Sequence, residues 1–175
     1  MKHFLANPGI RRGLRDGLIV SGLIAVDVVW TNVLFPPGAD ESDSDPEYVV
    51  QNLITFAVLA ALLILIGARA RRRSIDGAGP VTGAKAGASA GAVIGAMATL
   101  TYVTVNNVFL DIVSHQHDKR VAFAASGWTS MRAYLTLTQL GGGLFLIPAL
   151  AAVGALLGLL GALLVRPRAA ASRTA

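Results

Sequence analysis

A single aspartate interrupts the first long apolar segment of the chain. Asp27 lies near the middle of residues 18–35, which are otherwise mostly apolar. A central aspartate costs about 2.5 to 3.5 kcal/mol on membrane-insertion scales, and an ionisable side chain at such depth is typical of a proton relay, an ion ligand or a substrate contact. The structural alternative is a protonated Asp27 that hydrogen-bonds to a neighbouring helix and fixes its register. The sequence supports both interpretations equally.

Polar side chains recur in a later apolar segment, residues 88–110. Tyr102 and Asn106 are one helical turn apart and would share a face toward Asp27, and Asn107 follows directly. Such residues could line a path for a solute, a proton or an ion. Hydrogen bonding between membrane helices needs the same residues, at about 0.6–2 kcal/mol per contact, and this is the commoner role. A transport path is therefore the alternative interpretation.

The segment SHQHD (114–118) offers a candidate metal site. On a continuous helix Asp111, His115 and Asp118 would share one face, and His117 lies beside them. Carboxylates and imidazoles at this spacing can hold a divalent ion. Two histidines beside charged residues are more often a solvated helix end, so the metal site is the less favoured interpretation.

Signatures of enzymes and cofactor sites are missing from the sequence. GAGPVTGAKAG (77–87) matches neither the P-loop nor the dinucleotide-binding pattern, and no nucleophile elbow or metalloprotease helix occurs. The chain has no cysteine, which excludes disulfides and thiolate chemistry. We expect no enzyme activity and no cofactor. The net charge of +5 comes from arginines that flank apolar segments, so we expect no nucleic-acid partner.

The elements that position these residues are long apolar helices. Hydrophobic residues make up 54% of the chain and charged residues only 14%, and the mean hydropathy is +0.60. Four apolar runs are long enough, at about 17–25 residues, to cross a bilayer as helices: 18–35, 49–67, 88–110 and 140–165. The sequence therefore predicts an all-α, integral membrane four-helix bundle that forms one domain over residues 1–175.

Positive charges predict the orientation in a cell membrane, either an inner or a plasma membrane. Of the 15 lysines and arginines, only Lys119, Arg120 and Arg132 fall in the connections after the first and third runs. The positive-inside rule then puts both termini and the middle loop in the cytoplasm. An acidic loop (36–48) and a longer loop (112–135) lie outside. We expect the aromatic residues of the longer loop to anchor it at the interface, with Ser126 or Thr129 capping the fourth helix.

Small residues recur every fourth position in two of the predicted helices. The first ladder consists of Gly13, Gly17, Ser21 and Ala25, and the second of Gly83, Gly87, Gly91 and Gly95. Small residues on one helix face let another main chain approach closely in a membrane. Either the two ladders face each other, or one turns outward to a second copy. Gly154 and Gly158 add a small pair in the fourth helix.

The two ladders lie 70 residues apart, and TNVLF (31–35) resembles NNVFL (106–110). These similarities predict two parallel helical hairpins, 13–73 and 81–168, related by a pseudo-twofold axis. In the fourth helix Pro148 predicts a kink, because proline leaves the carbonyl of Leu144 without its usual donor. For function we expect a scaffold or accessory subunit of a membrane assembly, surrounded by lipid and associated with further copies or other membrane subunits.

Overall fold

The structure, a computed structural model, describes residues 7–38, 41–42, 44–73 and 79–165. The described residues form helices and no strand, which confirms the all-α prediction. The elements are α2 (Pro8–Val29), the π-helix η1 (Trp30–Leu34), α3 (Pro46–Arg72), α4 (Val81–Val108), α5 (Leu110–Val113), α6 (His117–Ser126) and α7 (Met131–Leu163). Four of these helices are long and apolar enough to cross a membrane: α2 with η1, α3, α4 and α7.

Each predicted apolar run covers most of one long helix, but all four helices begin before their runs. The amide groups of Gly9 and Ile10 donate to the side-chain oxygen of Asn7, which caps α2 at distances of 3.0 and 3.5 Å. Pro8 and Pro46 occupy the first positions of α2 and α3, where the missing amide hydrogen costs nothing. Helical signals therefore extend beyond the segments that hydropathy alone marks.

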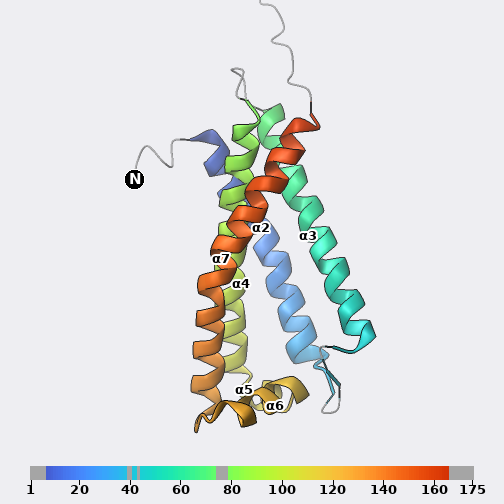
Figure 1. Cartoon of the computed structure of the whole chain (residues 1–175), viewed down its shortest axis with the longest axis vertical. Helices are drawn as coiled ribbons and strands as arrows, with labels where there is room; N and C mark the ends of the chain where they lie inside the picture. The colour runs from blue at the N-terminus through green and yellow to red at the C-terminus, as the bar shows by residue number, and fades with distance from the viewer. Residues whose placement is uncertain (1–6, 39–40, 43, 74–78, 166–175) are drawn as a thin grey trace, which may run out of the picture.

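The long helices alternate in direction, and α4 is the central one (Figure 1). α2 and α4 run away from one end of the molecule, while α3 and α7 return to it. We call this the basic end, because it carries seven arginines and Lys85: Arg11, Arg12, Arg15, Arg69, Arg71, Arg72 and Arg73. Lys2 and the arginines at 166, 168 and 173, predicted on the same side, lie outside the described residues. The short helices α5 and α6 lie at the opposite end.

α3 packs on the bundle only near the basic end. Leu63, Ile66 and Ala70 are buried in a core cluster with Val20 of α2 and with residues of α4. Every residue from 49 to 58 is exposed instead. Figure 1 shows the start of α3 standing apart from α7. The α4–α7 hairpin, in contrast, packs along its length.

The two hairpins therefore pack differently, and the predicted pseudo-twofold repeat is not confirmed. A true repeat would place the ladder of α2 against α3 in the way that the ladder of α4 meets α7. α2 and α3 instead make little contact with each other, and α2 packs mainly on α4. α7 is a single uninterrupted helix despite Pro148, and Figure 1 shows it changing direction partway along.

Candidate functional site

The glycine ladder of α4 faces α7. A Cβ atom built on Gly83, Gly87, Gly91 or Gly95 would lie less than 3.0 Å from an atom of α7. Most of the α7 atoms concerned belong to the main chain, at Ile147, Leu150, Gly154 and Gly158. Only glycine allows two helices to approach this closely, so that dispersion and weak Cα–H···O contacts accumulate between the backbones.

Three main chains meet near the basic end in a cluster that we call the glycine node. Its members are Gly67 of α3, Gly83 and Gly87 of α4, and Gly158 and Gly161 of α7. A Cβ on Gly67 would overlap the backbone of Gly158, and a Cβ on Gly161 would overlap the carbonyl of Ile64. The sequence did not point to Gly67, because an isolated glycine in a helix has no ladder around it.

The first ladder packs against a different face of α4. Gly13 faces Ala86 and Ser89, and a Cβ on Gly17 would lie 2.9 Å from the Cα of Ala90. Ser21 is buried and donates to the carbonyl of Gly17 in its own helix at 2.8 Å. Neither expected arrangement is therefore correct: the two ladders do not face each other, and both are covered within the chain. The half-buried Ala25 ends this ladder.

Arginines join helix ends at the basic end. Arg12 of α2 donates from Nη1 to the carbonyl of Ala70 and from Nη2 to that of Arg73, both at 3.2 Å. Arg71 donates to the carbonyl of Ala162 in α7. The last carbonyls of a helix lack intrahelical donors and carry its negative dipole end, so a guanidinium from a neighbour satisfies both needs. The sequence analysis assigned these arginines to orientation alone.

Asp27 lies on the exposed surface of α2. It follows Val20 by seven residues and so occupies the same side of the helix, the side that packs against Leu63 and Ile66 of α3. At the level of Asp27, however, α3 has already diverged. Within the described parts of the chain the Asp27 carboxylate has no hydrogen-bond or ion-pair partner.

The three polar residues of α4 occupy separate environments. Asn107 donates from Nδ2 to the Thr136 hydroxyl of α7 at 2.9 Å, which is an interhelical contact. Asn106 is only 3% exposed, and its Oδ1 has no hydrogen-bond partner among the residues that the structure describes. Tyr102 is half-buried against the core cluster at the opposite end. Tyr102 and Asn106 lie one turn apart on one face of α4, but Asn106 is buried whereas Asp27 is exposed, and a polar path that joins them to Asp27 stays a prediction.

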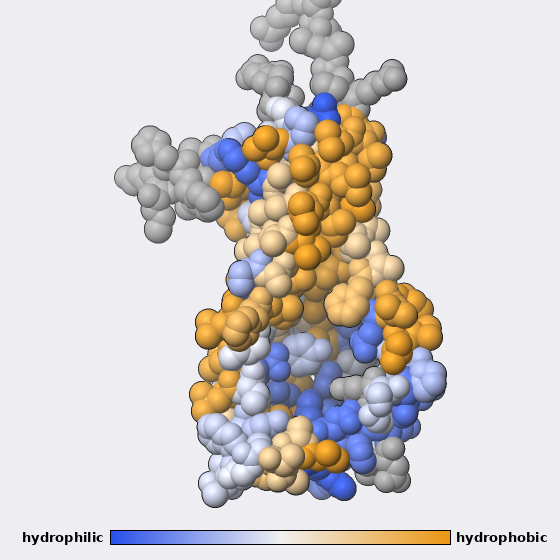
Figure 2. All heavy atoms as spheres, viewed as in Figure 1, coloured by the Kyte–Doolittle hydropathy of each residue, from blue (hydrophilic) through white to orange (hydrophobic). Residues whose placement is uncertain are grey.

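The half of the molecule away from the basic end is hollowed, and hydrophilic residues gather in the hollow (Figure 2). The bundle-facing stripe of α3 continues from Leu63 and Leu59 to Thr55 and Asn52 by helical periodicity. Both of these polar residues are exposed. Asp27 of α2 and Thr55 and Asn52 of α3 therefore lie beside the opening between the outer half of α3 and the rest of the bundle.

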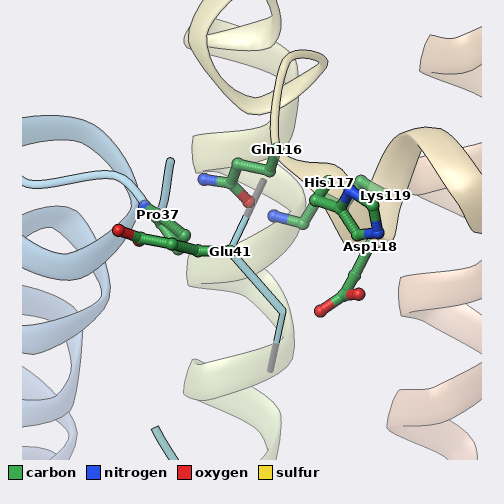
Figure 3. Close-up of a pocket in the computed structure, with 6 residues that line it drawn as sticks. All are labelled: Pro37, Glu41, Gln116, His117, Asp118 and Lys119. Carbon is green, nitrogen blue, oxygen red and sulfur yellow. The ribbon is translucent and has the colours of Figure 1, made fainter. Parts of the chain in front are cut away.

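α5 and α6 form a cap at the opposite end, hydrogen-bonded to η1 and to the loop after it. Gln116 donates from Nε2 to the carbonyl of Asn32 at 3.3 Å, and Lys119 donates from Nζ to Oδ1 of Asn32 at 3.4 Å. The Ser42 hydroxyl donates to Asp118 at 3.1 Å. A small pocket lies here, between Pro37 and Glu41 on one side and residues 116–119 on the other (Figure 3).

The expected metal face on a continuous helix does not exist. α4 ends at Val108, and a break at 114–116 separates α5 from α6. His115 Nδ1 lies 2.5 Å from the backbone carbonyl of Asp111, whereas Asp118 lies in α6 and binds Ser42. Across the described ranges no three His, Cys, Asp or Glu side chains are grouped to hold a metal ion. Ser130, rather than Ser126 or Thr129, caps α7 through the amide of Ala133 at 3.3 Å.

No protein-family model, curated protein or solved structure matches this chain.

Proposed function

We propose that the chain is a polytopic membrane protein with four membrane-spanning helices, in a cell membrane and with its basic end in the cytoplasm. Large apolar side chains cover its outer surface, such as Leu144 and Phe145, which are 76% and 79% exposed. Exposed apolar surface of this kind indicates a lipid environment. Arginines mark one end of the bundle, and Phe35 marks the other, where its ring packs on that of Trp30 with centroids 4.6 Å apart. Aromatic residues prefer the interface, and arginines prefer the cytoplasmic side.

We further propose that the protein is an accessory subunit or scaffold, whose open side receives a membrane helix of another subunit. One observation carries this proposal: α3 is an apolar helix of 27 residues that packs on its own chain over only about half of its length. Every residue of its outer half, from Val49 to Val58, is exposed in the described structure. This role needs no catalytic group and no cofactor.

The glycine ladders support this proposal indirectly. Both are already covered by other helices of the same chain, so they build the scaffold and do not offer a surface to a partner. The surface left for association, whether with another copy or another subunit, is the opening between α3 and the rest of the bundle.

Site-specific photocrosslinking in native membranes tests this proposal. A photoreactive amino acid at Leu53 or Phe56 probes α3, and the same group at Leu144 or Phe145 of α7 is the matched control, since all four side chains are exposed. We expect discrete protein adducts from α3, identified by mass spectrometry, and mainly lipid adducts from α7. Lipid adducts alone from all four positions would contradict the accessory role.

A proton or ion pathway is the second candidate, and the buried, unpaired Oδ1 of Asn106 favours it. An unsatisfied polar atom in a core is costly and calls for a ligand or a water molecule. The test is proton or cation flux into vesicles that hold the purified protein. Flux that disappears in both Asp27→Asn and Asn106→Leu variants, with the fold intact, would support the pathway. Flux equal to that of protein-free vesicles would exclude it.

A further inference from the structure

Asp27 is the only charged residue within the apolar part of the four long helices. It lies eleven residues after Asp16 and eight before Phe35, which at a rise of 1.5 Å per residue is about 17 Å and about 12 Å along the helix. Both distances are comparable with half of the roughly 30 Å thickness of the hydrocarbon core. The carboxylate therefore lies near the middle of the bilayer.

The other long helices supply no cation at this depth, and the nearest one described, Lys119 of α6, is bound to Asn32, five residues further along the helix. Residues 49–67 of α3, 88–108 of α4 and 140–163 of α7 contain neither lysine nor arginine. A second copy of the chain has the same deficiency. Phospholipid head groups lie at the membrane surface, too far away to neutralise a group at the centre.

The surroundings of Asp27 suit a helix better than lipid tails. The carboxylate lies on the side of α2 that faces α3, at the level where α3 has left the bundle. Thr55 and Asn52 continue the inner stripe of α3 along the same opening, and hydrophilic residues gather in the hollow (Figure 2). Acyl chains offer nothing to these groups, whereas charged groups within a membrane normally pair with one another or with other polar groups of the protein interior.

We infer that the opening between the outer half of α3 and the rest of the bundle, where Asp27 of α2 is exposed, binds a transmembrane helix of a different subunit, one that carries a lysine or arginine at the depth of Asp27. This inference rests on the proposed accessory role and names the chemistry of the partner. The Asp27 carboxylate pairs with the cation in the bilayer centre, and Thr55 and Asn52 offer hydrogen bonds beside it. The apolar remainder of the opening packs against the rest of the partner helix.

Model peptides can test this chemistry without knowledge of the natural partner. The full-length protein carries a donor dye in vesicles of phosphatidylcholine, and leucine–alanine peptides of about 20 residues carry an acceptor. The peptides differ only at the central position, which is lysine, leucine or aspartate. Energy transfer measured at increasing peptide density gives an apparent affinity for each peptide.

We expect the lysine peptide to bind about tenfold more tightly than the leucine peptide, the effect of roughly one polar contact between membrane helices. Asp27→Asn should abolish this preference. Asp16→Asn, at the basic end beside Arg15, should retain it. Helicity measured by circular dichroism checks that both variants fold.

Three results of this experiment would overturn the inference: equal binding of the lysine and leucine peptides, a preference that survives in Asp27→Asn, or energy transfer between two copies of the chain that excludes the peptide. The accessory role fails separately. Crosslinks from α3 to a partner without a central cation would leave that role standing and overturn only the chemistry inferred here. A lysine preference together with lipid adducts alone from α3 would leave the affinity of Asp27 for a cation standing and would contradict the accessory role.

Discussion

Gly87 and Gly154 face each other reciprocally across the α4–α7 contact. A Cβ on either residue would overlap the carbonyl oxygen of the other. Such a contact leaves no room for a side chain on either helix, so both positions require glycine. It ties the second hairpin together in the half near the basic end, one turn of α7 from Gly158, where the glycine node holds α3 to the same pair of helices.

The first prediction concerns this contact. Gly87→Ala should lower the free energy of unfolding by about 1–3 kcal/mol, the usual cost of overpacking. The control is Gly142→Ala in α7, where a Cβ meets nothing within 4 Å; alanine there should be neutral or stabilise by up to about 1 kcal/mol, because it favours the helix. Unfolding in mixed detergent micelles, followed by circular dichroism, measures both. Equal effects of the two changes would contradict the close contact.

The second prediction concerns the arginine at the end of α3. Arg12→Gln removes the charged donor to the carbonyls of Ala70 and Arg73. The site is partly exposed, so we expect a loss of about 1 kcal/mol and faster amide exchange in the last turn of α3. Arg11→Gln is the matched control, because Arg11 is exposed and carries the same charge. If Arg11→Gln accelerates exchange as much, net charge and not the hydrogen bonds holds this end.

The third prediction concerns the polar contact between α4 and α7. A double-mutant cycle with Asn107→Leu and Thr136→Val should give a coupling energy of about 0.6 kcal/mol, and at most about 2 kcal/mol. Thr104→Val and Thr138→Val form the control cycle, since both hydroxyls donate to carbonyls of their own helices, at 2.8 and 2.7 Å. That cycle should be additive. Additivity of the first cycle would mean that the Asn107 contact contributes nothing.

The fourth prediction concerns pH at the loop after α2. Glu41 accepts hydrogen bonds from the Tyr48 hydroxyl, at 2.5 Å, and from the Gly38 amide, at 2.7 Å. These bonds favour the charged carboxylate and lower the pKa of Glu41 below its ordinary value of 4.5. The order they give the loop is present above that value and is lost as the pH falls through the lowered pKa.

Tyr48→Phe removes the larger of these two effects. The pKa of Glu41 should then rise toward its ordinary value, as read from the carboxyl carbon shift in an NMR titration. Loop order should be lost at a higher pH than in the unchanged protein. A pKa that does not move would show that the tyrosine hydroxyl has no effect on the carboxylate.

Much of the architecture could be predicted from the sequence. Apolar length alone identifies the four long helices, because a span must be apolar whatever it packs against. The helix starts extend further, since Asn7, Pro8 and Pro46 act through local backbone geometry that hydropathy does not measure. α4 ends at Val108, close to the end of the predicted run at residue 110, whereas the short helices α5 and α6 in the loop that follows could not be predicted, because each is too short to show an apolar period.

The arrangement of the helices could not be predicted. A glycine ladder indicates that a main chain comes close but has no side chain to specify which one, so α7 was not identified as the partner of Gly83 to Gly95. Gly67 gave no signal at all. The exposure of Asp27 depends on the level at which α3 leaves the bundle. That level depends on the contact of α3 with α4 and α7 at the glycine node, which the sequence does not show. The arginine contacts depend on which helix ends are neighbours.

The most direct test of the account is a distance measurement on α3 and α7 at both ends. The chain has no cysteine, so spin labels can be attached to pairs of introduced cysteines in protein reconstituted alone in lipid nanodiscs. Arg69→Cys with Leu163→Cys reports on the basic end, and Val50→Cys with Leu144→Cys reports on the opposite half; the contact of Ile64 and Gly67 with Gly161 and Gly158 places the members of each pair at about the same level. We predict that the second pair lies farther apart by about one helix diameter, roughly 10 Å. Equal distances for the two pairs would mean that α3 packs along its whole length, which would contradict the opening and the partner helix placed in it.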